Sequence, residues 1–82
     1  LGGEGRNMKI SITIAQGDTE TSVIIDDRRR ISDVIGELAR QGYLPRNCKA
    51  FMRSAVQERV ISTINTFQEE GIYSGDKITE IK

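Results

Sequence analysis

The segment RISDVIGELARQGYLP, residues 30–45, limits most strongly what this chain can fold into. Its apolar side chains follow the i, i+3, i+4, i+7 spacing of one face of an α-helix, and they are Ile31, Val34, Ile35 and Leu38. Gly42 can adopt the left-handed conformation common at helix ends, and Pro45 cannot continue a helix. We therefore predict a helix that ends at about Gln41. Because an isolated helix of this length is marginally stable in water, its apolar face has to pack against other elements.

Strict alternation of apolar and polar residues predicts two β-strands before this helix. In residues 8–15, MKISITIA, the alternation is typical of a half-buried strand. Residues 16–19, QGDT, are typical of a tight turn, and residues 21–25 resume the alternation, so the two strands should form a hairpin. Ile24 falls on the polar side of the second strand, where it is either exposed or covered by an edge contact.

Two short apolar segments follow the helix. Residues 50–53, AFMR, predict a third strand in which Phe51 anchors the core and Met52 points the opposite way. Residues 60–62, VIS, predict a short fourth strand.

The last part of the chain predicts one helical turn and a closing strand. Residues 63–71, TINTFQEEG, have the spacing of a single helical turn and close on a glycine. Residues 77–82, KITEIK, predict the strand. Because Ile78 and Ile81 are three positions apart, they cannot share a face of a regular strand. Either Ile81 is exposed or a bulge turns it inward.

The order of these elements predicts an α+β fold. A sheet with one apolar face needs a cover, and the apolar face of the helix can supply it. With 82 residues the chain is one small domain. The first seven residues, LGGEGRN, show no periodicity, and we interpret residues 1–7 as a flexible tail or an expression remnant and residues 8–82 as the domain.

Composition excludes several function classes. Twelve lysines and arginines balance twelve aspartates and glutamates, so no net field draws the chain to nucleic acid or to a membrane. No apolar run is long enough to cross a membrane or form a signal-peptide core, so we expect a soluble, cytoplasmic protein. With no histidine and only Cys48, the chain lacks the usual zinc ligands and the commonest general base. We expect no metal, no cofactor and no enzymatic activity.

The polar residues before the helix leave two readings open. Asp26 or Asp27 is a candidate cap for its first turn, whereas the three arginines that follow oppose the helix dipole. Arg28, Arg29 and Arg30 form either a basic patch for an acidic partner or a solvated run paired with the two aspartates. Cys48 is more readily explained as a buried or incidental cysteine than as a nucleophile.

Taken in order, these features resemble ubiquitin. The chain shares with it a Met-start strand of alternating isoleucines, a hairpin, the core positions of the helix and the apolar residue and proline after it: Ile31, Val34, Leu38, Leu44 and Pro45. The segment before the last strand is also similar, at Thr66-Phe67, Gly71-Ile72, Gly75-Asp76 and Ile78. The resemblance covers residues 8–82 and implies a β-grasp fold, with a mixed sheet of four to five strands and one main helix across one face.

The ending GIYSGDKITEI, residues 71–81, is most similar to the YukD/EsaB family of bacterial ubiquitin-like proteins. Members of that family are small cytosolic proteins linked to type VII secretion. The resemblance implies a non-catalytic protein-interaction module that acts as an accessory or regulatory factor of such a system. Its partner would be another protein, with no small-molecule substrate and no membrane insertion.

One departure from ubiquitin bears on function. Ubiquitin and the sulfur carriers of similar fold need a flexible C-terminal Gly-Gly, because only unhindered glycine backbone can thread the channel of an activating enzyme. This sequence ends Glu80-Ile81-Lys82, which predicts a non-conjugating protein. The alternative is a modifier or sulfur carrier whose Gly-Gly lies beyond Lys82. A nucleic-acid binder using the three arginines is less favoured, because the chain has only two tyrosines and two phenylalanines for stacking.

The ubiquitin register implies a binding surface on the sheet. In that register Met52 takes the place of the exposed isoleucine at the centre of ubiquitin's recognition face, and Ile81 takes that of a neighbouring exposed valine. We expect these two residues to form a small apolar patch with a rim of Lys49, Arg53, Lys77 and Thr79. The alternative is that Met52 is an isolated exposed residue and that Ile81 is frayed or turned inward.

Overall fold

The computed structural model describes residues 9–45 and 49–81, which form one layer of sheet and one helix. The predicted tail at residues 1–7, Cys48 and the last residue of the predicted closing strand lie outside the described residues. The described elements are β1 (Lys9–Gln16), β2 (Thr19–Asp26), α1 (Ile31–Arg40), β3 (Phe51–Ser54), β4 (Arg59–Ser62) and β5 (Lys77–Thr79).

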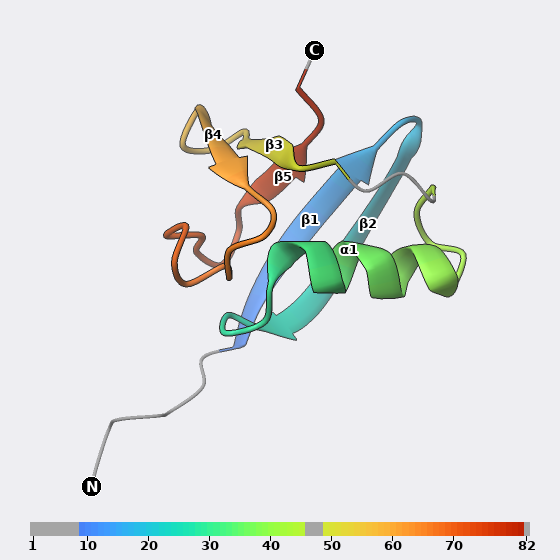
Figure 1. Ribbon diagram of the computed structural model, residues 1–82, viewed down its shortest axis with the longest axis horizontal. Coiled ribbons are helices and arrows are strands. Elements are labelled where there is room, and N and C mark those ends of the chain that lie inside the picture. Colours follow the sequence, from blue (N-terminus) through green and yellow to red (C-terminus); the bar gives the residue numbers. More distant parts are fainter. Residues whose placement is uncertain (1–8, 46–48, 82) are drawn as a thin grey trace, which may run out of the picture.

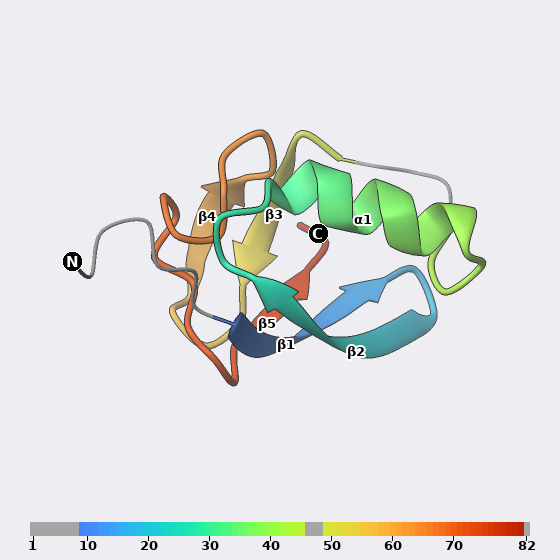
Figure 2. The same ribbon diagram turned by 90° about the horizontal axis from the view of Figure 1, so that it is seen from below.

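The five strands form a single mixed sheet in the order β2-β1-β5-β3-β4, and α1 lies across one of its faces (Figures 1 and 2). β5 runs parallel to β1 and antiparallel to β3, and both hairpins, β1–β2 and β3–β4, are antiparallel. This arrangement confirms the predicted α+β fold with a mixed sheet and one main helix.

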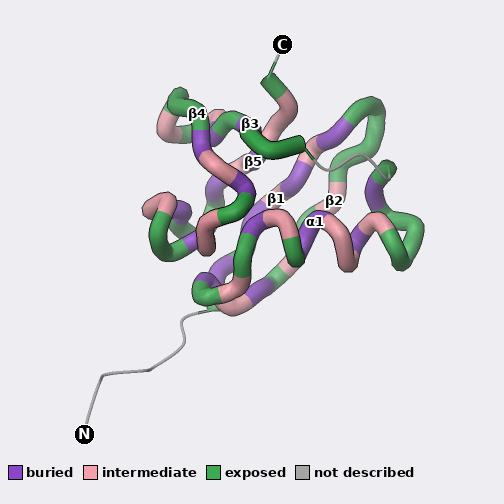
Figure 3. Tube along the Cα trace, viewed as in Figure 1, coloured by how far each residue is buried: buried purple, intermediate pink, exposed green. Residues whose placement is uncertain are grey.

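The first hairpin forms as predicted. Ile10, Ile12 and Ile14 are buried, and the residues between them are exposed or half-buried, so burial alternates along β1 (Figure 3). Gly17 has a φ of +60°, which a glycine adopts without steric cost, in the turn that joins the strands. Ile24 is 71% exposed, which decides between the two readings of its position.

The helix ends where its sequence predicts. All four residues of its apolar stripe are buried, and Gln41 is the C-cap. Gly42 has a φ of +86°, and the N–H groups of Gly42 and Tyr43 donate to the carbonyls of Ala39 and Leu38 at 3.1 and 2.9 Å. This pair of hydrogen bonds satisfies carbonyls that the end of a helix would otherwise leave unpaired.

The prediction that an aspartate caps the helix start is wrong. Arg30 occupies the N-cap position and makes no side-chain cap. Instead, the N–H groups of Ile31 and Ser32 donate to the backbone carbonyls of Asn65 and Thr63, at 3.0 and 2.7 Å. A segment more than thirty residues later therefore supplies the acceptors that a capping side chain normally provides.

The predicted facing of β3 is also wrong. Phe51 is 57% exposed, whereas Met52 is fully buried and pairs across β3–β4 with the buried Ile61. Alternation explains the outcome, because Phe51 and Arg53 share one face and an apolar core does not accommodate an unpaired arginine. The other β3 side chain that faces the core, Ser54, is fully buried as well.

The segment between β4 and β5 forms consecutive turns, and they include the predicted single helical turn. The N–H of Glu70 donates to the carbonyl of Thr66, four residues earlier, at 3.1 Å. Thr66 and Glu69 exchange two hydrogen bonds, from Thr66 N–H to Glu69 Oε1 at 2.9 Å and from Glu69 N–H to Thr66 Oγ1 at 3.0 Å. Phe67 is fully buried in the core beside the helix stripe and the strand isoleucines. The turns therefore bring a core side chain to the sheet without a second helix in the part of the chain that the structure describes.

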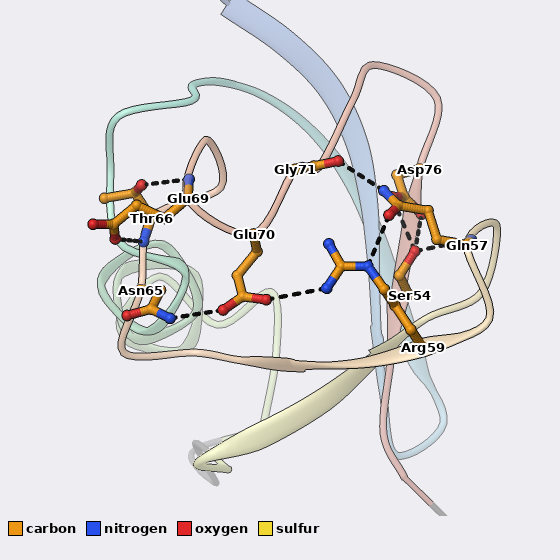
Figure 4. Close-up of polar contacts among 9 residues, drawn as sticks. All are labelled: Ser54, Gln57, Arg59, Asn65, Thr66, Glu69, Glu70, Gly71 and Asp76. Carbon is orange, nitrogen blue, oxygen red and sulfur yellow. Dashed lines mark hydrogen bonds and ion pairs between the residues drawn. The ribbon is translucent and has the colours of Figure 1, made fainter.

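A buried polar cluster fixes β5 against β3 (Figure 4). The Asp76 carboxylate accepts hydrogen bonds from Ser54 Oγ at 2.8 Å, from Gln57 Nε2 at 3.1 Å and from the Lys77 N–H at 2.8 Å. Gln57 Nε2 also donates to the Gly71 carbonyl at 2.8 Å. These bonds set the position of the strand that carries the outward residues considered next.

Candidate functional site

The candidate site is the outer face of the sheet, which points away from α1. Cross-strand pairs place residues on the same face, and the pairs Arg53–Val60 and Arg53–Thr79 put these three side chains together. Phe51, two positions before Arg53, points to the same side. Phe51, Arg53, Val60 and Thr79 therefore lie together on the outer face of β3, β4 and β5, outside the hydrophobic core.

A groove of about 640 Å³ lies on this face, and we call it the outer groove. It is lined by Ala15, Gly17, Arg53, Val60, Lys77, Thr79, Glu80 and Ile81. Ala15, an outward residue of β1, has only a methyl side chain, and the residues of β3, β4 and β5 that line the groove have longer ones. The groove therefore lies beside a small residue of β1.

Three exposed apolar side chains surround the centre of the outer face. Phe51 is 57%, Val60 54% and Ile81 48% exposed. Val60 and Ile81 line the groove, and Phe51 lies beside it on β3. Large apolar side chains grouped on one face around polar residues are typical of a surface that binds another protein.

Two ion pairs neutralise lysines at the edges of the groove. Lys77 Nζ lies 2.7 Å from Glu20 Oε2, so its side chain crosses over β1 from β5 to β2. Lys49 Nζ lies 4.0 Å from Glu80 Oε2, and Glu80 Oε1 accepts a hydrogen bond from the Gly17 N–H at 2.6 Å. These exposed pairs position side chains more than they stabilise the fold.

Arg53 differs from these lysines. Its guanidinium forms no ion pair with any carboxylate in residues 9–45 or 49–81. The backbone of Arg53 pairs with Val60 and Thr79 in the sheet, and its carbonyl oxygen also accepts a hydrogen bond from the Thr79 hydroxyl at 3.5 Å. The groove therefore has one cationic group at its centre that the described part of the chain leaves without a counter-ion.

The structure brings together four of the six predicted binding residues. Arg53, Lys77, Thr79 and Ile81 line the outer groove, and the exposed Lys49 adjoins it through Glu80. The prediction that Met52 is exposed on this face is wrong, because that side chain is fully buried. Whether the remaining residues bind a partner stays a prediction.

Sequence reasoning missed Phe51 and Val60 as members of this face. The signal for Phe51 was present, because it shares a strand face with Arg53 and an arginine favours the outward side. Val60 carried no comparable signal, because both Val60 and Ile61 are apolar and only the pairing of β4 with β3 decides which one is buried. Ala15, Gly17 and Glu80 became part of the groove only through the parallel pairing of β1 with β5.

The arginine run before α1 is divided. Arg29 Nη1 lies 2.9 Å from Glu37 Oε1 on α1, so its ion pair is with the helix and not with Asp26 or Asp27. Arg28 and Arg30 are exposed. The three arginines therefore do not form a single uncompensated basic patch.

Neither a cluster of metal ligands nor a membrane-spanning helix is present among the described residues. Among residues 9–45 and 49–81, no group of three or more histidine, cysteine, aspartate or glutamate side chains is placed to hold a metal ion. In the same ranges no helix has the length and apolar character needed to cross a bilayer. The groups of the outer groove that are open to a partner are the apolar side chains of Val60 and Ile81, the guanidinium of Arg53 and the hydroxyl of Thr79.

The chain resembles known proteins in its three-dimensional structure and not in its sequence. No protein-family model matches the chain, and no curated protein matches it in sequence. The C-terminal ubiquitin-like domain of mouse tubulin-specific chaperone e is 17% identical, with a TM-score of 0.63 over 95% of this chain and 91% of that one. A designed protein based on ubiquitin is 19% identical, with a TM-score of 0.64 over 94% of this chain and 88% of that one.

A third solved structure, the EccD5 ubiquitin-like domain from Mycobacterium xenopi, is 20% identical. Its TM-score is 0.51 over 92% of this chain and 99% of that one. Identities this low describe shared architecture and not shared activity. Together with the strand order and the single helix across one face, these likenesses show that the chain has a ubiquitin-like β-grasp fold.

Proposed function

We propose that this protein is a non-catalytic ubiquitin-like interaction module that binds another protein through the outer groove. The observation that carries the proposal is the grouping of Phe51, Val60 and Ile81 around Arg53 on an open face of the sheet. Interface centres are enriched in aromatic residues and arginine. The fold supports such a role, because it presents a rigid sheet face whose other side is filled by α1.

We further propose that the partner belongs to a bacterial type VII secretion system and that the protein acts in the cytoplasm as an accessory or regulatory factor. The support is the similarity of residues 71–81 to the ending of YukD/EsaB proteins. Those residues form the turn after Phe67 and the strand that carries Thr79 and Ile81 to the outer face. The resemblance therefore involves the same part of the chain as the proposed site.

A pair of matched variants tests the proposal. Ile81→Asp places a charge in the outer groove, whereas Ile24→Asp makes the same change at an exposed isoleucine of β2 that does not line it. Each tagged protein is used to capture partners from lysates of a bacterium with a type VII system, with quantification by mass spectrometry. We expect type VII components with the wild type and with Ile24→Asp, and their loss with Ile81→Asp.

Two results would contradict separate parts of the proposal. Capture that is unchanged in Ile81→Asp would exclude the outer groove as the interface. Capture that depends on Ile81 but contains no type VII component would leave the binding module in place and exclude the secretion role.

A further inference from the structure

Arg53 stands at the centre of the outer groove, between Val60 on β4 and Thr79 on β5. Any partner that covers Val60 and Ile81 also removes water from the guanidinium between them. An unpaired charge that is desolvated at an interface costs binding free energy unless the partner supplies a counter-charge. The position of this one side chain therefore constrains the chemistry of what can bind.

The other charges of the groove do not meet this need. Lys77 is paired with Glu20, and Lys49 and the Gly17 N–H both engage Glu80. Glu80 is the acidic residue of the groove lining, and its carboxylate contacts those two groups and forms no ion pair with Arg53. The charge that remains for a partner to neutralise is the positive charge of Arg53.

We infer that the outer groove selects a segment in which a carboxylate is flanked by aliphatic side chains, and that Arg53 is the residue that determines this specificity. The carboxylate pairs with the guanidinium, which can donate two parallel hydrogen bonds, while the aliphatic side chains contact Val60 and Ile81. A segment with lysine or arginine in place of the carboxylate would be repelled. This inference rests on the proposed function and adds the chemistry of the partner to it.

A selection from random peptides displayed on phage, with the wild-type protein immobilised, provides a defined probe. We expect the enriched peptides to contain an aspartate or glutamate next to leucine, isoleucine, valine or methionine. The enriched peptides are then synthesised, and their affinities are measured by fluorescence anisotropy. Arg53→Glu should weaken binding by at least about tenfold, since a charge-assisted hydrogen bond is lost and a repulsion is added.

A matched charge reversal and a rescue make the test specific. Arg40→Glu makes the same substitution at an exposed residue of α1, on the other side of the sheet, and should change affinity by no more than about twofold. Replacing the peptide's acidic residue by lysine should abolish binding to the wild type and restore it to Arg53→Glu. Circular dichroism of each variant checks that the fold is retained.

The outcomes separate this inference from the proposed function. Peptides that need Ile81 but bind wild type and Arg53→Glu equally would overturn the carboxylate specificity and leave the binding face intact. If no selected peptide loses binding in Ile81→Asp, the outer groove is not a docking surface, and both proposals are wrong.

Discussion

The N–H of Gly17 donates a hydrogen bond to Glu80 Oε1 at 2.6 Å, which joins the turn between β1 and β2 to the residue that follows β5. Both residues line the outer groove. This contact links the first hairpin to the end of the described chain over the outer face, so it should influence the shape of the groove more than the stability of the core.

Glu80→Ala should loosen the β1–β2 turn. We expect faster amide hydrogen exchange at Gly17 and a decrease of about 1 kcal/mol in the free energy of unfolding, because one exposed hydrogen bond contributes little. Exchange followed by NMR and urea denaturation measure the two effects. The Gly75 amide, which bonds to the Ser11 carbonyl, serves as internal control. Unchanged exchange at Gly17 would show that Glu80 does not hold the turn.

Met52→Ala should destabilise the protein more than Phe51→Ala does. Met52 is fully buried, so its truncation should lower the free energy of unfolding by about 2–4 kcal/mol. Phe51 is 57% exposed, and its truncation should cost less than about 1 kcal/mol. Urea denaturation of both variants tests the facing of β3, and a larger loss in Phe51→Ala would contradict it.

Two glycines of the helix region should respond in opposite directions to alanine. Gly42 has a φ of +86°, so Gly42→Ala should destabilise the protein by about 1 kcal/mol. Gly36 lies within α1, and a Cβ added there meets no atom within 4 Å. Gly36→Ala should therefore raise stability by about 0.5–1 kcal/mol, because alanine favours the helix. Thermal unfolding compares the two, and a loss in both would argue against an open helix surface at Gly36.

Asp76→Ala should be among the more damaging polar substitutions. Asp76 is 3% exposed, and its removal leaves the hydroxyl of the buried Ser54 and the amide of Gln57 without this acceptor. We expect a loss of about 2–4 kcal/mol in the free energy of unfolding, measured in urea. Ser54→Ala removes one donor to Asp76 and the acceptor of the Gln57 N–H, and it should cost about 1–2 kcal/mol. Equal losses in the two variants would mean that the carboxylate has no role beyond its bond to Ser54.

The periodic spacing of apolar residues predicted the longer elements, because a repeat can be recognised only over several residues. The stripe of α1 and the alternation of β1 each extend over several residues, so their buried faces could be named from the sequence. β3 has four residues with one large apolar side chain on each face, Phe51 and Met52, and apolar character alone does not choose between them. Ser54 is buried because Asp76, distant in sequence, accepts its hydrogen bond.

The residues of the outer face were predicted in part for the same reason. The ubiquitin register placed Ile81, Lys77 and Thr79 correctly, since they lie around a short strand fixed by a glycine turn. It failed at Met52, where a shift of one residue exchanges the two faces of a strand. The hydrogen-bond acceptors at the start of α1 could not be predicted either. They are the backbone carbonyls of residues 63 and 65, and no side-chain type marks such a contact in the sequence.

The position of β5 has a consequence for how the protein forms. β5 lies between β1 and β3, so in the described sheet strand pairing connects the two hairpins only through residues 77–79 (Figure 1). During synthesis residues up to Ser62 can form both hairpins and a nascent helix, but no strand pairing joins these parts until β5 leaves the ribosome. Native structure should therefore appear late and cooperatively, and the unfinished chain, with the sides of β1 and β3 still unpaired, is the species most exposed to aggregation or to capture by a chaperone.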